Sequence, residues 1–231
     1  MAKPHKNYQK AKEKIEPREY PVADAIALLK EIKTAKFDES IDLSIRLGVD
    51  PKYPDQMVRG TVVLPHGTGR AKKVLVIATG DKQKEALDAG ADFVGGEEMI
   101  EKIKTENWFD FDVLIVTPDT MKNVGKLGKV LGPKGLMPSP KAGTVTFNIK
   151  ESVEEVKKGR VEFKVDKTGI INSSIGKSSF VNEFLVDNAK EFLAAVLKAK
   201  PVALKGKYVW SIYVSSTMSP SVKLSLQDFE I

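Results

Sequence analysis

The sequence predicts a two-domain protein of mixed α/β and α+β class. Candidate strands in residues 1–67 and 160–231 alternate apolar and polar side chains, which is typical of a sheet with one buried and one wet face. Candidate strands in residues 68–159 are continuous apolar runs separated by helical segments, which is typical of a parallel sheet covered on both faces. We therefore expect a discontinuous α+β domain from both ends of the chain, with an inserted Rossmann-like three-layer α/β domain and a double hinge at the two crossings.

The distribution of charge agrees with this division. The whole chain has 37 Lys and Arg against 31 Asp and Glu, a net charge of +6. Residues 68–159 hold 15 basic and 14 acidic side chains, whereas the two outer segments together hold 22 and 17. The basic surplus therefore lies in the outer segments, whose domain we expect to present a basic surface to its partner.

The first outer segment is predicted to contain one helix and two strands. Residues 1–18 hold six cations and two acids, so they form either a partly ordered tail or a basic arm for nucleic acid. Residues 21–32 begin with Pro21 and repeat apolar side chains at helical spacing. Residues 40–49 alternate strictly, and a second strand is expected over residues 58–64.

The central segment is predicted to alternate strands with helices, as a parallel sheet requires. Strands are expected over residues 74–78, 92–94, 113–116 and 144–149, and helices over residues 82–89, 97–105, 119–131 and 152–158. A loop rich in glycine and proline, residues 132–143, carries two lysines. It is either a solvated connector or a loop whose backbone N–H groups and lysines face phosphates.

The second outer segment opens with two alternating strands, residues 161–165 and 170–175, joined by a tight Lys-Thr-Gly turn. A long helix over residues 181–200 and strands over residues 208–215 and 222–226 follow. The outward positions around the turn carry cations and small hydrogen-bonding groups: Lys164, Lys167, Asn172, Ser174 and Lys177. Such a surface suits a phosphate backbone, so RNA is the first hypothesis for its ligand.

Composition argues against catalysis and against a membrane. The chain has no cysteine, which excludes disulfides, cysteine zinc sites and thiol catalysis. Its two histidines, His5 and His66, lie in the tail and in a turn, so neither a metal site nor a triad is expected. No apolar run approaches the ~20 residues that span a bilayer, and no signal peptide is visible. We expect a cytoplasmic protein without cofactor or metal.

Two glycine motifs resemble nucleotide-binding motifs, but neither has the required pattern. Gly176-Lys177-Ser178 lacks the earlier glycine of a P-loop, because that position is Ile171. Gly67 and Gly69 precede a strand instead of following one, contrary to a dinucleotide-binding turn. A nucleotide-dependent enzyme built on the central unit stays as the alternative hypothesis, supported by its parallel sheet alone.

Several side chains of the outer segments are candidates for RNA contact. Phe37 is either a plug of the core or a ring that stacks on a base or sugar, and Met218 presents the same choice. Thr217, Ser219 and Ser211 offer compact hydroxyls suited to a ribose 2′-hydroxyl. This argument is strengthened because Ser40, Thr168, Ser211 and Thr217 all flank strands of the same predicted domain.

Residues 124–145 (VGKLGKVLGPKGLMPSPKAGTV) resemble the long signature of the bacterial large-subunit ribosomal protein L-one family. Shorter matches occur in order along nearly the whole chain: AKFDE at 35–39, VRGTV at 58–62, LPHG at 64–67, GADFVGG at 90–96, DKTG at 166–169, IGK at 175–177 and TM at 217–218. The resemblance implies the same two-domain fold as the one argued above.

The resemblance also implies a function. It implies a non-enzymatic part of the large ribosomal subunit, monomeric when free, that binds the stalk region of 23S rRNA beside the exit-site tRNA. It implies a second role as a translational repressor that binds its own operon mRNA. The RNA-contact positions that it implies are Lys36, Phe37, Ser40, Lys164, Asp166, Lys167, Thr168, Ser211, Thr217 and Met218.

Two candidate positions depart from the family pattern. Ser219 stands where glycine usually follows Thr-Met, and Asn172 stands where histidine is common. Both stay candidates for RNA contact.

Overall fold

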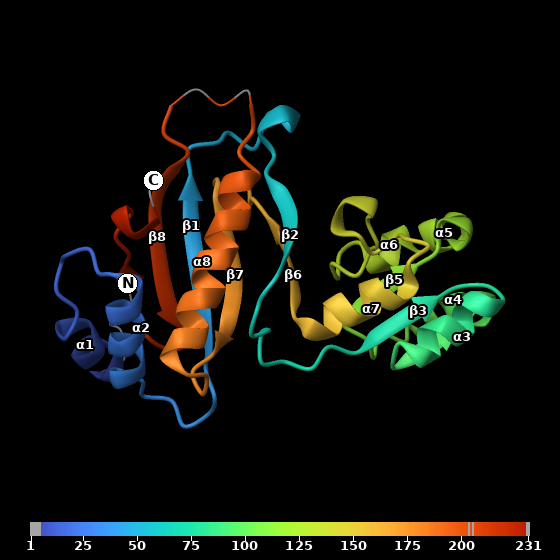
Figure 1. Ribbon diagram of the computed structural model, residues 1–231, viewed down its shortest axis with the longest axis horizontal. Helices are drawn as coiled ribbons and strands as arrows, with labels where there is room; N and C mark the ends of the chain where they lie inside the picture. Colours follow the sequence, from blue (N-terminus) through green and yellow to red (C-terminus); the bar gives the residue numbers. More distant parts are fainter. Residues whose placement is uncertain (1–5, 203, 205, 230–231) are drawn as a thin grey trace. The chain divides into compact units, whose positions relative to one another are not determined.

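The computed structural model describes residues 6–202, 204 and 206–229. His5 and the first part of the predicted basic arm lie outside the described residues. The chain divides into two compact units, Met1–Gly69 with Val161–Ile231, here called the outer unit, and Arg70–Arg160, the inner unit. Each unit combines helices with β-sheet (Figure 1), so the predicted mixed α/β class is confirmed.

The outer unit is built on a four-stranded antiparallel sheet in the order β7-β1-β8-β9. Its strands are β7 (Ile170–Lys177), β1 (Ser40–Leu47), β8 (Val209–Ser216) and β9 (Val222–Lys223). A separate pair is formed by β2 (Arg59–Val63) and β6 (Arg160–Lys164). The central strand β1 comes from the first outer segment and its neighbours from the second, so the two segments share one sheet.

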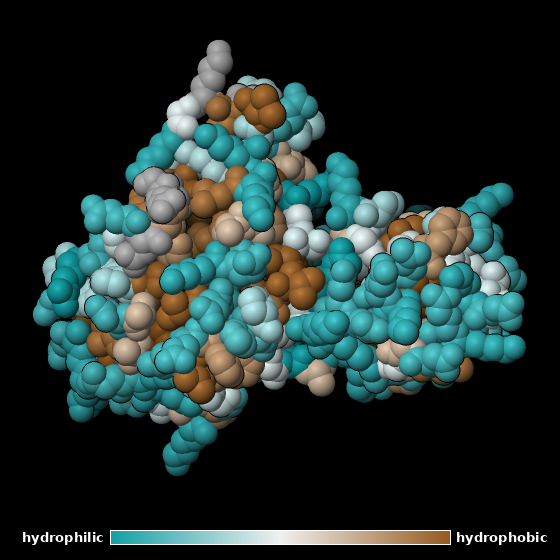
Figure 2. Space-filling model, viewed as in Figure 1, coloured by the Kyte–Doolittle hydropathy of each residue, from teal (hydrophilic) through white to brown (hydrophobic). Residues whose placement is uncertain are grey.

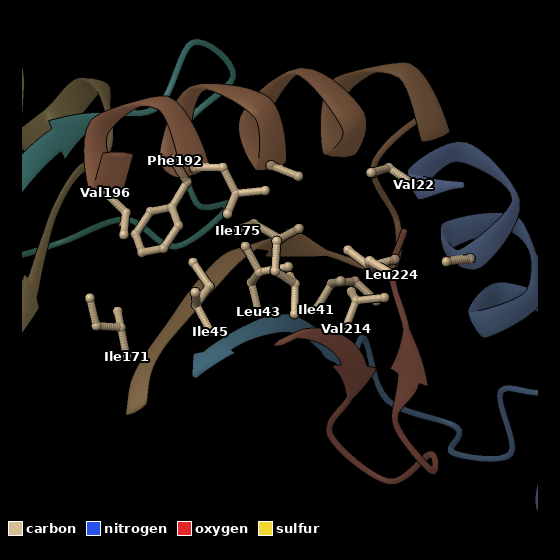
Figure 3. Close-up of a cluster of buried hydrophobic side chains, with 14 of the residues drawn as sticks. Val22, Ile41, Leu43, Ile45, Ile171, Ile175, Phe192, Val196, Val214 and Leu224 are labelled. Atoms are coloured by element: carbon tan, nitrogen blue, oxygen red, sulfur yellow. The ribbon is translucent and has the colours of Figure 1, made fainter. Parts of the chain in front are cut away.

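Two helices, α2 (Val22–Glu31) and α8 (Asn182–Lys198), pack on one face of this sheet. Every second residue of β1 points toward them, and Ile41, Leu43, Ile45 and Leu47 are at most 2 % exposed. Figure 3 shows Phe192 of α8 and Val22 of α2 among the apolar side chains that rise from the strands. Burial of apolar surface, at about 25 cal/mol per Å², holds these helices on the sheet and leaves its other face to polar side chains.

The helix α1 (Lys6–Glu13) lies in the segment that was predicted as a tail or basic arm. Ala11 is buried against the core of the outer unit, and Lys14 pairs with Glu31 of α2 at 3.0 Å. Ion pairs this exposed contribute up to about 1 kcal/mol, and the partly buried Ile15 packs on the same core as Ala11.

The inner unit is a three-layer α/β structure. Its parallel sheet has the order β4-β3-β5, from β4 (Phe93–Gly95), β3 (Val74–Ile77) and β5 (Val113–Val116). One core cluster joins the sheet to α3 (Asp81–Asp88) and α7 (Ile149–Lys158), and the other joins it to α4 (Glu97–Glu106), α5 (Pro118–Gly125) and α6 (Gly128–Leu131). Because both clusters are internal, the visible surface of this unit is mostly hydrophilic (Figure 2).

Two element predictions in the inner unit are wrong. The single helix expected over residues 119–131 is broken into α5 and α6, because Gly125 and Gly128 are poor helix formers and the N–H groups of Lys126 and Leu127 bond only three residues back. The strand expected over residues 144–149 is absent from the described sheets. Only Val145 forms an isolated bridge with Val116, and the buried Ile149 already begins α7.

The two strands that flank the turn at residues 166–169 belong to different sheets. The tight turn is present, with the N–H of Gly169 donating to the carbonyl of Asp166 at 3.2 Å. However, β6 pairs with β2 whereas β7 pairs with β1, so the two strands that flank the turn lie in different sheets. Alternation of side chains predicts strands but carries no information on which strands pair.

Candidate RNA-binding surface

The polar face of the four-stranded sheet gathers candidate residues from distant parts of the chain. The side chains of β1 that point away from the helices are Ser40, Asp42, Ser44 and Arg46. Strand register places Asn172 and Ser174 beside them on β7, and Ser211, Tyr213 and Ser215 on β8. We call these nine residues the open face. Its dense hydroxyls are compact donors and acceptors, the groups that suit ribose and phosphate oxygens.

One end of the open face carries two exposed apolar side chains. Phe37 is 53 % exposed and Met218 57 %, so the interpretation of either as a core plug is wrong. Together with Lys36 they line a pocket of about 610 Å³, to which Asn7 and Tyr8 of α1 also contribute. The sequence did not single out Tyr8. An aromatic residue within a lysine-rich segment is a weak signal that could have drawn attention to it.

A buried carboxylate holds this end in place. Glu39 is fully buried, and its two carboxylate oxygens accept hydrogen bonds from the backbone N–H of Met218 at 3.1 Å and the hydroxyl of Ser216 at 3.2 Å. Bonds to a charged acceptor are among the stronger ones in proteins. Glu39 therefore ties the start of β1 to the turn that follows β8, a role that its place in a predicted connector did not reveal.

The side-chain hydroxyls of the same turn accept hydrogen bonds from backbone N–H groups. The N–H of Ser40 donates to Oγ1 of Thr217 at 3.1 Å, and the N–H of Ser216 donates to Oγ of Ser219 at 2.9 Å. The side chain of Ser219 thus closes its own turn, which gives this departure from the family pattern a structural role. Thr217 stays exposed and keeps a free lone pair for a further partner.

The glycine-lysine corner at residues 176–179 is bonded to the start of β1 and to the connector before it. Lys177 donates from Nζ to the hydroxyl of Ser40 at 2.8 Å. The carboxylate of Asp38 accepts from the hydroxyls of Ser178 and Ser179 and from the N–H of Ser179, at 2.8–3.0 Å. The bond from the Ser179 hydroxyl is the first of the contacts that hold the pKa of Asp38 below its usual value.

The opposite end of the open face is the turn between β6 and β7. One carboxylate oxygen of Asp166 accepts from the hydroxyl of Thr168 at 2.6 Å and from the N–H groups of Thr168 and Ile170 at 2.8 and 2.9 Å. The Thr168 hydroxyl, followed by the Ile170 N–H, lowers the pKa of Asp166. Asp166 therefore shapes the turn, while Lys167 at its tip and Lys164 on β6 are exposed.

The predicted residues line a surface and do not converge on one point. Ser40 and Arg46 lie near the two ends of the eight-residue β1, which spans roughly 23 Å at 3.3 Å per residue. Asn172 lies between them, where its amide oxygen accepts from the Ser44 hydroxyl at 2.7 Å. Lys36, Lys164 and Lys167 have no ion-pair partner among the described residues. An elongated polar face, with unpaired lysines in the neighbouring connectors and on β6, suits a polymer of phosphates better than a small molecule.

The two lowered carboxyl pKa values predict acid sensitivity. Asp38 and Asp166 stay ionised in the folded chain to a lower pH than in the unfolded chain, where carboxyls of this type titrate near pH 4. Their stabilising effect is therefore complete above about pH 5 and is lost as the pH falls through the lowered folded-state values.

The Asp38→Asn, Asp166→Asn double variant should lose less stability between pH 7 and pH 3 than the unmodified chain, measured by urea denaturation. Asp55→Asn, at the exposed Asp55 of the short 3₁₀ helix Pro54–Gln56, is the control and should leave the pH dependence unchanged. Identical pH profiles for all three proteins would contradict the expectation.

The remaining described features point away from other classes of site. No group of His, Asp and Glu in the described part of the chain could hold a metal ion. Among the helices that the structure describes, none has the length and apolar character to cross a membrane.

The hydroxyls of the open face, the exposed Phe37 and Met218 at one end and the exposed Lys167 in the turn at the other are features of a nucleic-acid-binding protein.

Comparison with known proteins gives the family. A model of the ribosomal protein L1p/L10e family matches residues 29–220, and the chain belongs to this family. The chain is 58 % identical over 229 residues to "Large ribosomal subunit protein uL1" of Solibacter usitatus (strain Ellin6076), covering 99 % of this chain and 97 % of that protein. It is also 58 % identical over 230 residues to the protein of the same name from Persephonella marina (strain DSM 14350 / EX-H1), covering 98 % and 95 %.

Family membership confirms the resemblance seen in the sequence. It makes the chain a ribosomal protein of a structural, non-enzymatic family, and the alternative hypothesis of a nucleotide-dependent enzyme is wrong. The parallel sheet that suggested an enzyme is a fold shared by proteins of many functions.

Proposed function

We propose that this protein is a constituent of the large ribosomal subunit that binds the stalk region of 23S rRNA through its open face. The observation that carries the proposal is that Ser40, Asn172 and Ser211 lie on one face of a single sheet, with residues 36–39, 166–169 and 217–219 at the ends of its strands. Both relatives named above are large-subunit proteins, and they match nearly all of this chain.

The chemistry of the open face supports RNA as the ligand. Lys36, Lys164 and Lys167 would contact phosphates, which supply most of the affinity. Thr217 and Ser211 would meet ribose 2′-hydroxyls, the group that distinguishes RNA from DNA. Phe37 and Met218 would press on a sugar or an unstacked base at the pocket end, where both are exposed.

We further propose the finer roles that the resemblance implied. The protein assists the release of deacylated tRNA from the exit site, and it represses translation by binding its own operon mRNA as a monomer in the cytoplasm. A folded surface that binds one RNA by its shape and backbone suits a second RNA of similar structure. The two units, connected by chain crossings at residues 69–70 and 160–161, would act as separate domains about a double hinge.

Salt dependence of RNA affinity tests the proposal. Binding to a synthetic 23S stalk fragment should weaken linearly in log affinity against log salt, with a slope of about 0.7–0.9 per phosphate neutralised. Lys36→Ala and Lys167→Ala should each reduce that slope by about the same amount, because each removes one phosphate contact. The measurement is filter binding across a series of salt concentrations.

Lys84→Ala is the matched control, because Lys84 is an exposed lysine of α3 in the inner unit. It should leave both affinity and slope unchanged. A stalk fragment that binds no better than a scrambled RNA of equal length, or an affinity insensitive to salt, would contradict the proposed function.

A further inference from the structure

A β-bulge places an unpredicted aromatic residue on the open face. Arg46 of β1 pairs with Ser211 of β8, but the next residue, Leu47, pairs with Val209, so Trp210 is an extra residue in its strand. Strict alternation would put Trp210 and Ser211 on opposite faces of the sheet. The bulge instead turns Trp210 toward Arg46, a member of the open face, and re-aiming a side chain beside a functional site is a recurrent use of bulges.

The indole of Trp210 is held on two sides. The guanidinium carbon of Arg46 lies 4.9 Å from the centre of its ring. A Cβ added at Gly48 would lie 2.6 Å from the indole nitrogen, so the absence of a side chain at Gly48 is what lets the ring rest there. The ring is thus fixed in orientation while 51 % of the residue stays exposed. A pre-oriented, half-exposed ring loses little conformational entropy when it binds a planar partner.

The surroundings of Trp210 match an RNA base more closely than another partner. Its strand neighbour Ser211 is a candidate RNA contact. The turn that carries Lys167 is at the same end of the sheet, because the N–H of Leu47 donates to the carbonyl of Gly169 at 2.8 Å. These three neighbours are polar or cationic, which suits a nucleotide better than an apolar protein or lipid surface. A cation beside an indole is a common arrangement for stacking on bases.

We propose that Trp210, with Arg46 against its ring, is a stacking site for an unpaired RNA base. This site lies at the end of the open face, next to Ser211. The inference rests on the proposed RNA-binding function and adds a contact to it. Phe37 and Met218 occupy the other end of the same face, so the bound RNA presents unpaired or unstacked nucleotides at two places separated by the length of β1.

Affinity for the 23S stalk fragment gives the first test. Trp210→Ala should weaken binding by about 5- to 150-fold, the range expected for loss of one base stack, and should leave the salt slope unchanged because stacking neutralises no phosphate. Arg46→Lys keeps the charge and loses the planar guanidinium, so it should weaken binding by a smaller factor. Phe147→Ala removes an exposed ring of the inner unit and should have no effect.

Fluorescence gives a second test that does not depend on a destabilised variant. The chain has two tryptophans, and in a Trp108→Phe protein Trp210 is the single indole emitter. Phe at position 108 keeps an aromatic ring beside Phe93 and Phe111 in the inner unit. Titration with the stalk fragment should quench Trp210 at the same midpoint as binding itself.

The two tests separate this inference from the proposed function. Full RNA affinity in Trp210→Ala, or unchanged Trp210 emission at saturating RNA, would overturn the proposed stacking site. The proposal that the open face binds RNA would remain intact. Failure of the unmodified protein to prefer the stalk fragment over scrambled RNA would overturn the proposed function, and the proposed stacking site with it.

Discussion

Glu39→Ala is expected to destabilise the outer unit by about 3–6 kcal/mol and to abolish specific RNA binding. Its carboxylate accepts two hydrogen bonds, from the N–H of Met218 and the hydroxyl of Ser216, in a fully buried position. Hydrogen bonds to a charged group contribute about 1.5–3 kcal/mol each, and their removal leaves both donors buried or half-buried without a partner. The freed turn would no longer present Thr217 and Met218 beside Lys36 and Phe37.

Urea denaturation and binding to the stalk fragment measure the two effects. Glu39→Gln keeps the volume of the side chain and one carbonyl acceptor, so it should cost roughly half as much stability. Glu31→Ala is the surface control, because Glu31 is exposed and its ion-pair partner among the described residues is the exposed Lys14. It should cost less than about 1 kcal/mol. Equal losses from Glu39→Ala and Glu31→Ala would show that the buried carboxylate does not organise the site.

The parts of the fold that could be predicted are those governed by local periodicity. The alternation of Ile41, Leu43 and Ile45 with polar residues determines both a strand and its buried face, and the structure follows it. The pairing of β6 with β2 and of β7 with β1 depends on the packing of distant segments, which no local pattern encodes. The break between α5 and α6 was readable in principle, because Gly125 and Gly128 both lie within the expected helix.

The residues of the candidate site likewise divide into those indicated by a local sequence pattern and those that depend on contacts between distant segments. The sequence leaves two interpretations of Phe37 and Met218, a filler of the core or an RNA contact, and the exposure of both side chains excludes the first. Glu39 was missed because a carboxylate in a connector is normally solvated, and its burial depends on the turn at residues 216–219, nearly the whole chain away. Trp210 was missed because its face is set by a bulge, and a one-residue shift of register reverses the direction that alternation predicts.

Phe192→Ala is expected to destabilise the outer unit by about 3–5 kcal/mol and to leave the inner unit unaffected. Phe192 is fully buried and meets Phe163 edge-on, with ring centres 5.5 Å apart (Figure 3 shows its position under α8). Its removal costs the transfer energy of the ring and leaves a cavity between α8 and the sheet. If the two units fold independently, none of this cost reaches the core around Leu114 of the inner unit.

Each unit contains one tryptophan, which makes the two stabilities separately measurable. In a Trp108→Phe background Trp210 reports the outer unit, and in a Trp210→Phe background Trp108 reports the inner unit. Phe192→Ala should lower the urea midpoint seen by Trp210 by about 1.5–2.5 M, for a denaturant slope near 2 kcal/mol/M, and should leave that of Trp108 in place. Leu114→Ala should do the reverse, because Leu114 is buried in the inner unit. Coincident shifts at both tryptophans would mean that the chain unfolds as one cooperative body. A double hinge between independent domains would then lose its physical basis, because each unit must stay folded while the segments between them move.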